Sequence, residues 1–144
     1  MNSIRVHFKL DQVDDYPPVA VESIWTQELP GDGGYVIDSI PFFINSATLG
    51  DRISVSEDEG RLWFDGVVET SDNSLLRVVL FDDALIDEVR LSLQRLGCAV
   101  ETLAAKSLLA VNVPPESKLS SVIAYLESLS NRSLADYEEA ILRQ

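Results

Sequence analysis

The side chains best suited to catalysis or metal binding are few in this sequence, and their spacing fits no known constellation. The 144 residues include one histidine, His7, and one cysteine, Cys98. A zinc site needs several imidazole or thiolate ligands that converge on the ion. Serine hydrolysis would need a G-x-S-x-G turn, which is absent, with His7 as its only base. We therefore expect no catalytic residue, no metal ion and no cofactor.

Adjacent carboxylates are the remaining groups that could act as acid and base. Asp14–Asp15 fall in a turn, Asp82–Asp83 are placed to cap a helix, and Glu138–Glu139 fall on the polar face of an expected helix. Each pair thus has a sufficient structural explanation. The glycine-rich segment Gly31–Gly34 lacks the lysine of a phosphate-binding loop. The acidic run Glu57–Glu59 has too few ligands for a calcium loop.

The charge of the chain limits the classes of partner. There are 24 acidic and 11 basic residues, giving a net charge of −13. Residues 1–73 carry 14 acidic and 4 basic groups, which accounts for −10 of this total. Such a field repels nucleic acids and anionic membranes and attracts basic proteins. A general contribution to solubility explains the same charge equally well.

The cysteine content and the hydropathy of the chain predict its cellular compartment. A lone Cys98 cannot form an internal disulfide, which fits a reducing cytosol. The N-terminus lacks the apolar region of a secretory signal, and no apolar run approaches the roughly 20 residues of a membrane span. We expect a cytoplasmic protein.

The first half of the chain has the pattern of short strands separated by turns. Apolar and polar residues alternate, as in half-buried strands, and proline or glycine clusters interrupt them. The expected strands are Ile4–Leu10, Val19–Thr26, Tyr35–Ile37, Ile53–Ser56 and Leu62–Val68. They predict a small antiparallel β-sheet or open barrel in residues 1–73.

The second half, residues 74–144, mixes strands and helices. The expected order is a strand over 74–81, a helix over 82–96, strands over 98–103 and 108–113, and helices over 117–129 and 133–142. The first five elements form a ferredoxin-like β-α-β-β-α unit that lacks its fourth strand. We expect 62–70 to supply that strand, which would merge both halves into one α+β domain spanning 1–144. Residues 74–144 expressed alone should then be unstable, because an apolar sheet edge would stay open.

Several phrases together make the chain resemble a bacterial family, the domain-of-unknown-function family numbered 4265. The matching phrases are Asp15–Val19, Glu22–Trp25, Ile40–Phe43, Leu49–Asp51, Gly60–Phe64, Ser74–Val78 and Tyr137–Glu139. The resemblance implies a small bacterial cytosolic domain without an assigned reaction or catalytic residues. The family pattern has a histidine where this chain has Asn73, which weakens any activity proposed for that histidine. Small acidic domains of this sort are associated with immunity to polymorphic toxins.

Three function classes remain. The first is a non-enzymatic acidic protein-binding module, specifically an immunity protein that occludes a bacterial toxin domain. The second is a regulatory domain that senses a small ligand, with Asp82–Asp83 receiving an amine. The third is an enzyme with an unfamiliar carboxylate or arginine site, for which Arg77 is the basic candidate.

A basic protein partner should contact the acidic first half. Turns that project from the scaffold can enter a cleft, and aromatic side chains beside carboxylates can anchor a cationic surface. Trp63 and Phe64, adjacent in an expected strand, should point to opposite faces. The expected partner-binding residues are Asp14, Asp15, Tyr16, Glu57, Asp58, Glu59 and Asp65.

Overall fold

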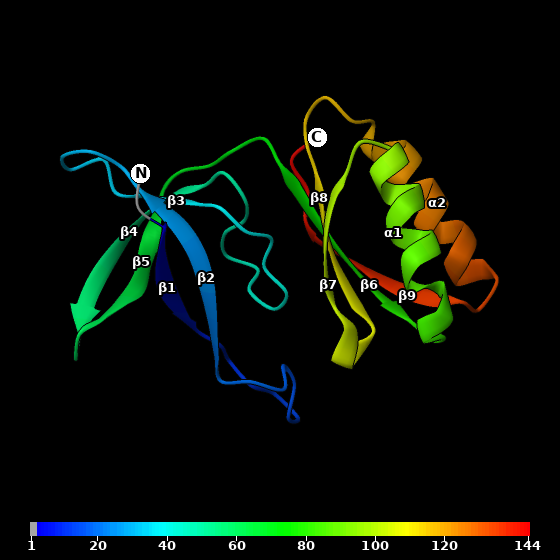
Figure 1. Cartoon of the computed structure of the whole chain (residues 1–144), viewed down its shortest axis with the longest axis horizontal. Helices are drawn as coiled ribbons and strands as arrows, with labels where there is room; N and C mark the ends of the chain where they lie inside the picture. The colour runs from blue at the N-terminus through cyan, green and yellow to red at the C-terminus, as the bar shows by residue number, and fades with distance from the viewer. Residues whose placement is uncertain (1–2) are drawn as a thin grey trace. The chain divides into compact units, whose positions relative to one another are not determined.

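The computed structural model describes residues 3–144, which form a mixed α+β structure (Figure 1). The chain divides into two compact units, Met1–Ser71 and Asp72–Gln144. The first unit is a β-barrel, and the second is a four-stranded sheet with two α-helices.

All five strands expected in the first half are present. They are β1 (Ser3–Lys9), β2 (Val21–Glu28), β3 (Tyr35–Ile37), β4 (Arg52–Asp58) and β5 (Arg61–Glu69). Successive strands pair antiparallel, and β1 pairs in parallel with β5 where His7 faces Trp63. The barrel is therefore closed rather than open, with one parallel junction. Closure removes sheet edges that would otherwise be free to pair with other chains.

The alternation of β1 fixes which side chains fill the barrel. Val6 and Phe8 are buried inside it, and Phe8 stacks on Phe64 with ring centroids 4.5 Å apart. Trp63, one residue before Phe64, lies on the opposite face of β5, against His7. The expectation that these neighbouring aromatic residues diverge is confirmed.

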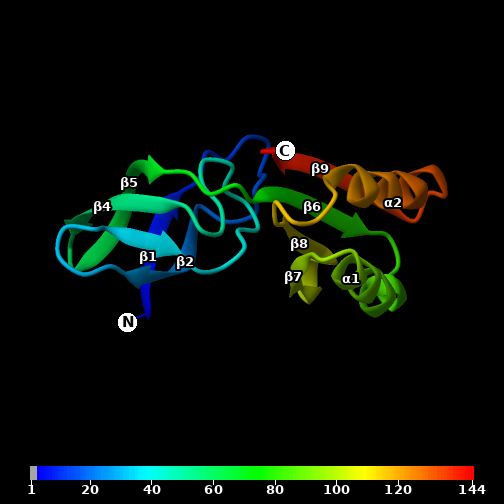
Figure 2. The same ribbon diagram turned by 90° about the horizontal axis from the view of Figure 1, so that it is seen from above.

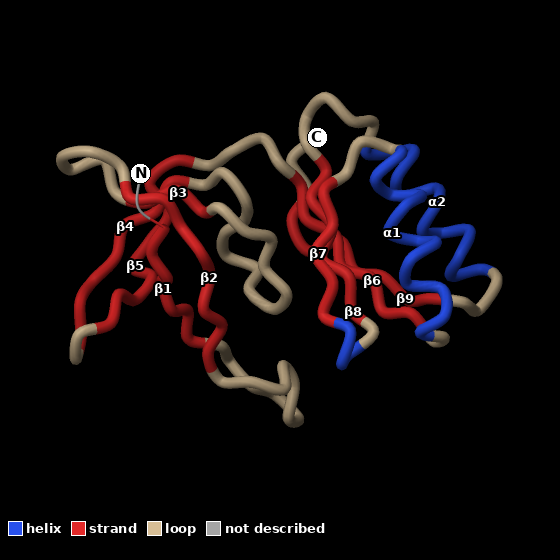
Figure 3. The backbone as a smooth tube through the Cα atoms, in the orientation of Figure 1, coloured by secondary structure: helices blue, strands red, loops and turns tan. Residues whose placement is uncertain are grey.

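The second unit has the element order β-α-β-β-α-β. Its elements are β6 (Ser74–Leu80), η1 (Asp83–Leu85), α1 (Ile86–Arg95), β7 (Ala99–Leu103), η2 (Ala104–Lys106), β8 (Leu108–Val113), α2 (Leu119–Asn131) and β9 (Ala135–Ile141). The strands lie in the order β7-β8-β6-β9, all antiparallel. Figures 2 and 3 show both helices on one face of this sheet.

The apolar stripes of the helices account for this packing. Val89 and Leu93 of α1 and Val122 and Leu126 of α2 are buried against the sheet.

No helix within residues 3–144 has the length and apolarity to cross a membrane.

The terminal segment is a strand, which corrects the helix expected over residues 133–142. Ser133 has a positive φ of 57°, and the Leu134 amide donates to the Leu129 carbonyl at 3.0 Å, which ends α2. Ala135 and Tyr137 then face the core of the second unit, the period of a strand. The edge of β6 supplies backbone partners that outweigh the helix propensity of the local sequence.

The expected pairing of residues 62–70 with the second sheet is wrong. This segment is β5, which pairs with β4 and β1 inside the barrel. The place beside β6 belongs to β9, so the second sheet obtains its fourth strand from its own unit. The expectation that residues 74–144 are unstable for want of that strand loses its basis.

Candidate functional site

The loop between β1 and β2 contains a tight two-residue turn built from the expected acidic pair. The amide of Val13 donates to the Tyr16 carbonyl at 2.8 Å, and the Tyr16 amide donates back to the Val13 carbonyl at 3.0 Å. Asp14 and Asp15, between them, have φ values of 53° and 63°. Two positive φ values in such a turn are typical of the type I′ geometry. We call Val13–Tyr16 the acidic finger.

The acidic finger exposes apolar as well as charged groups. The exposed fraction is 69% for Val13 and 58% for Tyr16. The Tyr16 ring lies edge-on to Phe43, with centroids 6.3 Å apart. Aspartate tolerates positive φ better than most residues, but two in succession still store backbone strain. Strain of this kind is often found at functional sites.

The second acidic cluster lies at the tip of the β4–β5 hairpin. Asp58 pairs with Arg61 across the turn, and Glu59 and Gly60 have φ values of 52° and 77°. The carboxylates of Glu57, Asp58 and Glu59 are exposed there. The β1–β2 loop and this hairpin leave the barrel at separate places in both views (Figures 1 and 2). Asp65 is exposed farther along β5, outside both clusters.

The outer face of β1, β2 and β5 carries both tryptophans of the chain, each beside a cation. Arg5 pairs in register with Trp25, and its guanidinium carbon lies 4.7 Å from the Trp25 ring centroid. The Lys9 ammonium nitrogen lies 5.4 Å from the Trp63 centroid. His7 stands between these pairs, 5.4 Å from Trp63 between ring centroids. We call Arg5, His7, Lys9, Trp25, Trp63 and Arg61 the tryptophan face.

The tryptophan face was not expected from the sequence, although the alternation in β1 indicates part of it. Arg5, His7 and Lys9 alternate with buried residues, so the period of two places all three on the outer face. Their proximity to the tryptophans depends on strand register, which one sequence does not reveal. Beside Trp63 the surface has a depression of about 360 Å³. Its lining residues are Lys9, Ser56, Asp58, Trp63 and Phe64.

The charges of the tryptophan face affect the pKa of His7. Burial lowers the pKa of His7 below its usual 6.5, and the positive charges of Arg61 and Arg5 lower it further. His7 Nδ1 also lies 2.6 Å from the Ser23 hydroxyl. The imidazole is therefore mostly neutral at pH 7, in a locally positive field.

We expect His7 to titrate with a midpoint below 6.5, because burial and two cations disfavour its charged form. The ring protons of this single histidine give an unambiguous NMR titration. Replacing Arg61 with serine should raise the midpoint towards 6.5, whereas a remote Lys118→Ser change should leave it unmoved. A midpoint at or above 6.5 in the parent protein would contradict this arrangement of charges.

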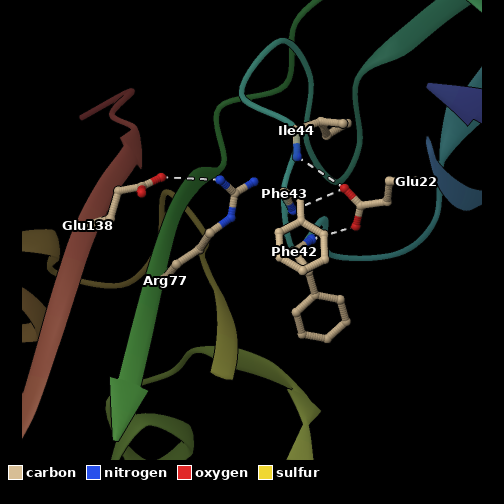
Figure 4. Close-up of polar contacts among 6 residues, drawn as sticks. All are labelled: Glu22, Phe42, Phe43, Ile44, Arg77 and Glu138. Carbon is tan, nitrogen blue, oxygen red and sulfur yellow. Dashed lines mark hydrogen bonds and ion pairs between the residues drawn. The ribbon is translucent and has the colours of Figure 1, made fainter. Parts of the chain in front are cut away.

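Two carboxylates in family-like phrases have structural partners (Figure 4). Glu22 accepts hydrogen bonds from the backbone amides of Phe42, Phe43 and Ile44 at 2.7, 3.0 and 3.0 Å. In the second unit, Arg77 is 5% exposed, and its Nη1 lies 3.1 Å from Glu138 Oε1. These contacts give Glu22 and the Arg77–Glu138 pair structural roles.

The other residues considered for ligand binding or catalysis are also hydrogen-bonded or buried within the chain. The Asp82 side chain accepts from the Ala84 amide at 2.9 Å and caps η1, and Asp83 accepts a hydrogen bond from the Ser107 hydroxyl. These carboxylates, expected to receive an amine in a ligand-sensing domain, thus have partners within the chain. Burial raises the pKa of the Cys98 thiol to about 11, so it is not a thiolate at neutral pH.

A metal centre finds no support in the described part of the chain. Within residues 3–144 no three His, Cys, Asp or Glu side chains gather to hold an ion. The side-chain oxygen of Asn73 lies 3.4 Å from the side-chain amide nitrogen of Asn112.

Comparison with known proteins places the chain in a family. The family model described as "Domain of unknown function (DUF4265)" matches residues 22–137, most of the chain. The chain belongs to this family. No curated protein matches it. A structure titled "Novel crystal structure of a hypothetical protein from Neisseria gonorrhoeae" is similar in fold, with a TM-score of 0.84 and 20% identity over 100% of this chain and 98% of that one.

The phrases by which the sequence resembles DUF4265 contact one another in this DUF4265 protein. Glu22 of one phrase holds the amides of Phe42 and Phe43 of another. Arg77 likewise pairs with Glu138, 61 residues later in the chain. Each of these contacts joins segments that lie far apart in the sequence.

Proposed function

We propose that this DUF4265 protein is a non-enzymatic module that binds a basic protein partner through the acidic finger. The structure of the finger carries the proposal: two aspartates at positive φ, closed by two backbone hydrogen bonds and flanked by exposed Val13 and Tyr16. A preorganised loop loses little conformational entropy on binding. Tyrosine is a frequent anchor at protein interfaces, so the finger combines an anchor with a charged tip.

The charge of the chain supports a basic partner. The net charge of −13 attracts and orients a cationic protein over a distance comparable with the Debye length, about 8 Å at physiological salt. The hairpin tip, Glu57–Glu59, adds a second exposed cluster of the same sign. Rim charges of this kind raise the association rate more than the lifetime of the complex.

We further propose that the partner is a bacterial toxin domain and that this protein is the immunity protein that occludes it. A toxin that acts on an anionic substrate holds lysine and arginine side chains in its cleft. The aspartates of a projecting finger can pair with those cations and keep the substrate out.

The second unit would serve as a scaffold. Its β-α-β-β-α-β order and β7-β8-β6-β9 arrangement support a ferredoxin-like assignment.

The test begins with a partner isolated from the native host on the immobilised protein and then purified. Association rates with this partner are measured against salt concentration for the parent and an Asp14→Ser/Asp15→Ser variant. Asp136→Ser/Glu139→Ser serves as the matched control, since both variants remove two exposed carboxylates. We expect the finger variant to associate about ten-fold more slowly and with a flatter salt dependence.

The control variant should associate as the parent does, apart from a small uniform effect of net charge. If the finger variant matches the parent while the β9 variant loses binding, the proposed surface is wrong. An isolated partner that is itself acidic would overturn the charge argument as well.

A further inference from the structure

The tryptophan face concentrates positive charge on a strongly acidic protein. Residues 1–73 contain four basic side chains, and three of them, Arg5, Lys9 and Arg61, belong to this face. All three are exposed. Among residues 3–144, no ion pair involves Arg5, Lys9 or Arg61, so the three cations of the face lack a carboxylate partner. The positive charge of this face is thus not neutralised by the acidic residues of the same chain.

Beside these cations Trp25 is exposed and Trp63 is half-buried. Trp25 is 45% exposed, although tryptophan is costly to leave in water and is enriched at protein interfaces. The depression beside Trp63, a recess of about 360 Å³, borders this face and is also lined by Phe64 of the barrel core. Aromatic surface, a recess and cations without a carboxylate partner together form a binding surface with its own chemistry, distinct from the acidic finger.

We propose that the tryptophan face binds an acidic peptide segment of a protein partner. The carboxylates of the peptide pair with Arg5, Lys9 and Arg61, and an aromatic or aliphatic side chain enters the depression beside Trp63. Asp58 also lines the depression, so an uncharged side chain suits its interior better than a carboxylate. This inference goes beyond the proposed function and does not rest on the finger.

Charge complementarity selects a peptide over single-stranded nucleic acid. Nucleic-acid platforms stack bases on open aromatic rings along a basic groove. Here Arg5 and Lys9 lie over the rings of Trp25 and Trp63, where such bases would stack. A continuous phosphate backbone would also meet the field of a chain with a net charge of −13. At physiological salt, where the Debye length is about 8 Å, a short segment with a few carboxylates interacts chiefly with the nearby cations.

Intrinsic fluorescence reports on this face directly, because both tryptophans of the chain belong to it. The probe is a capped octapeptide of alternating glutamate and phenylalanine, titrated into the full-length protein at physiological salt. We expect a saturable change in emission that weakens with added salt. The matched peptide with lysine in place of glutamate should give none.

The variant Arg5→Ser/Lys9→Ser should bind the acidic peptide about ten-fold more weakly than the parent. Arg95→Ser/Arg132→Ser, which removes two exposed cations of the second unit, should bind as the parent does. When each ion is referred to its quenching of free N-acetyltryptophanamide, iodide should quench the parent tryptophans more strongly than caesium despite the negative net charge, and the first variant should lose this preference. The quenching readout needs no peptide and reports the local field independently.

Three results would overturn the proposal. The first is a parent protein that gives no saturable response to the acidic peptide, or a response unchanged in the Arg5→Ser/Lys9→Ser variant. The second is saturation by an oligothymidylate but not by the peptide, which would assign the face to nucleic acid. The third is an emission change that follows protein concentration alone, with dimers in sedimentation analysis, which would assign the face to a second copy of this chain.

Discussion

Residues 72–144 expressed alone are expected to unfold cooperatively, whereas residues 72–134 should not fold. The buried cluster formed by β6, β8, α1 and α2 lies within the longer fragment, which also keeps β9 on β6. The Arg143 amide further donates to the Ser74 hydroxyl at 2.8 Å, which fastens the end of the chain. Removing β9 opens the edge of β6 and uncovers the core beside Ala135, a loss of many contacts at once.

Circular dichroism during thermal unfolding and size-exclusion chromatography of both fragments check this expectation. The longer fragment should be monomeric, with a single sigmoidal transition, and the shorter one should aggregate or lack a transition. If residues 72–134 fold as well as residues 72–144, the pairing of β9 with β6 contributes little. If neither fragment folds, the second unit does not hold together through its own core.

Asp51→Ala is expected to destabilise the barrel by about 2–4 kcal/mol, the largest effect we expect of a single polar substitution. Asp51 is fully buried, with an exposed fraction of 0%. Its side-chain oxygens accept the Thr48 amide at 3.0 Å and the Ser71 amide at 2.8 Å. Alanine would leave both donors without this acceptor, and buried unsatisfied amides are costly.

Chemical denaturation of the full chain measures the free energy of unfolding. Asp51→Asn should also destabilise the barrel, because an amide nitrogen would replace one acceptor oxygen and oppose a backbone donor. Asp65→Ala, at an exposed position of β5, is the control and should change the free energy by no more than about 0.5 kcal/mol. An Asp51→Ala protein as stable as the control would remove Asp51 from the framework of the barrel.

Local periodicity was enough to predict most of the elements. The strict alternation in β1 and the helical spacing of Val89 and Leu93 each depend on one element and a buried face. Residues 135–141 could not be placed in this way, since alanine and glutamate there favour a helix locally. The strand forms because β6 offers an unpaired edge, a fact of tertiary structure. Barrel closure likewise depends on β1 meeting β5 across more than 50 residues.

For the candidate sites, too, local sequence placed single residues, whereas their contacts depend on the tertiary structure. Asp14 and Asp15 were placed in a turn by the sequence, but the closing bonds between Val13 and Tyr16 emerged only from the structure. The tryptophan face needs the register that sets Arg5 beside Trp25, and hydrophobic pattern alone does not fix which outward residues are neighbours.

Site-specific photo-cross-linking from the acidic finger tests the central claim most directly. A photoreactive phenylalanine analogue replaces Tyr16 in the protein expressed in its native host, and the same analogue replaces Leu91, an exposed residue of α1, as the control. We expect a basic protein to cross-link from position 16 and not from position 91, and to disappear when Asp14 and Asp15 are both serine. Cross-linking of that protein from position 91 alone, or from position 16 regardless of the aspartates, would contradict the account.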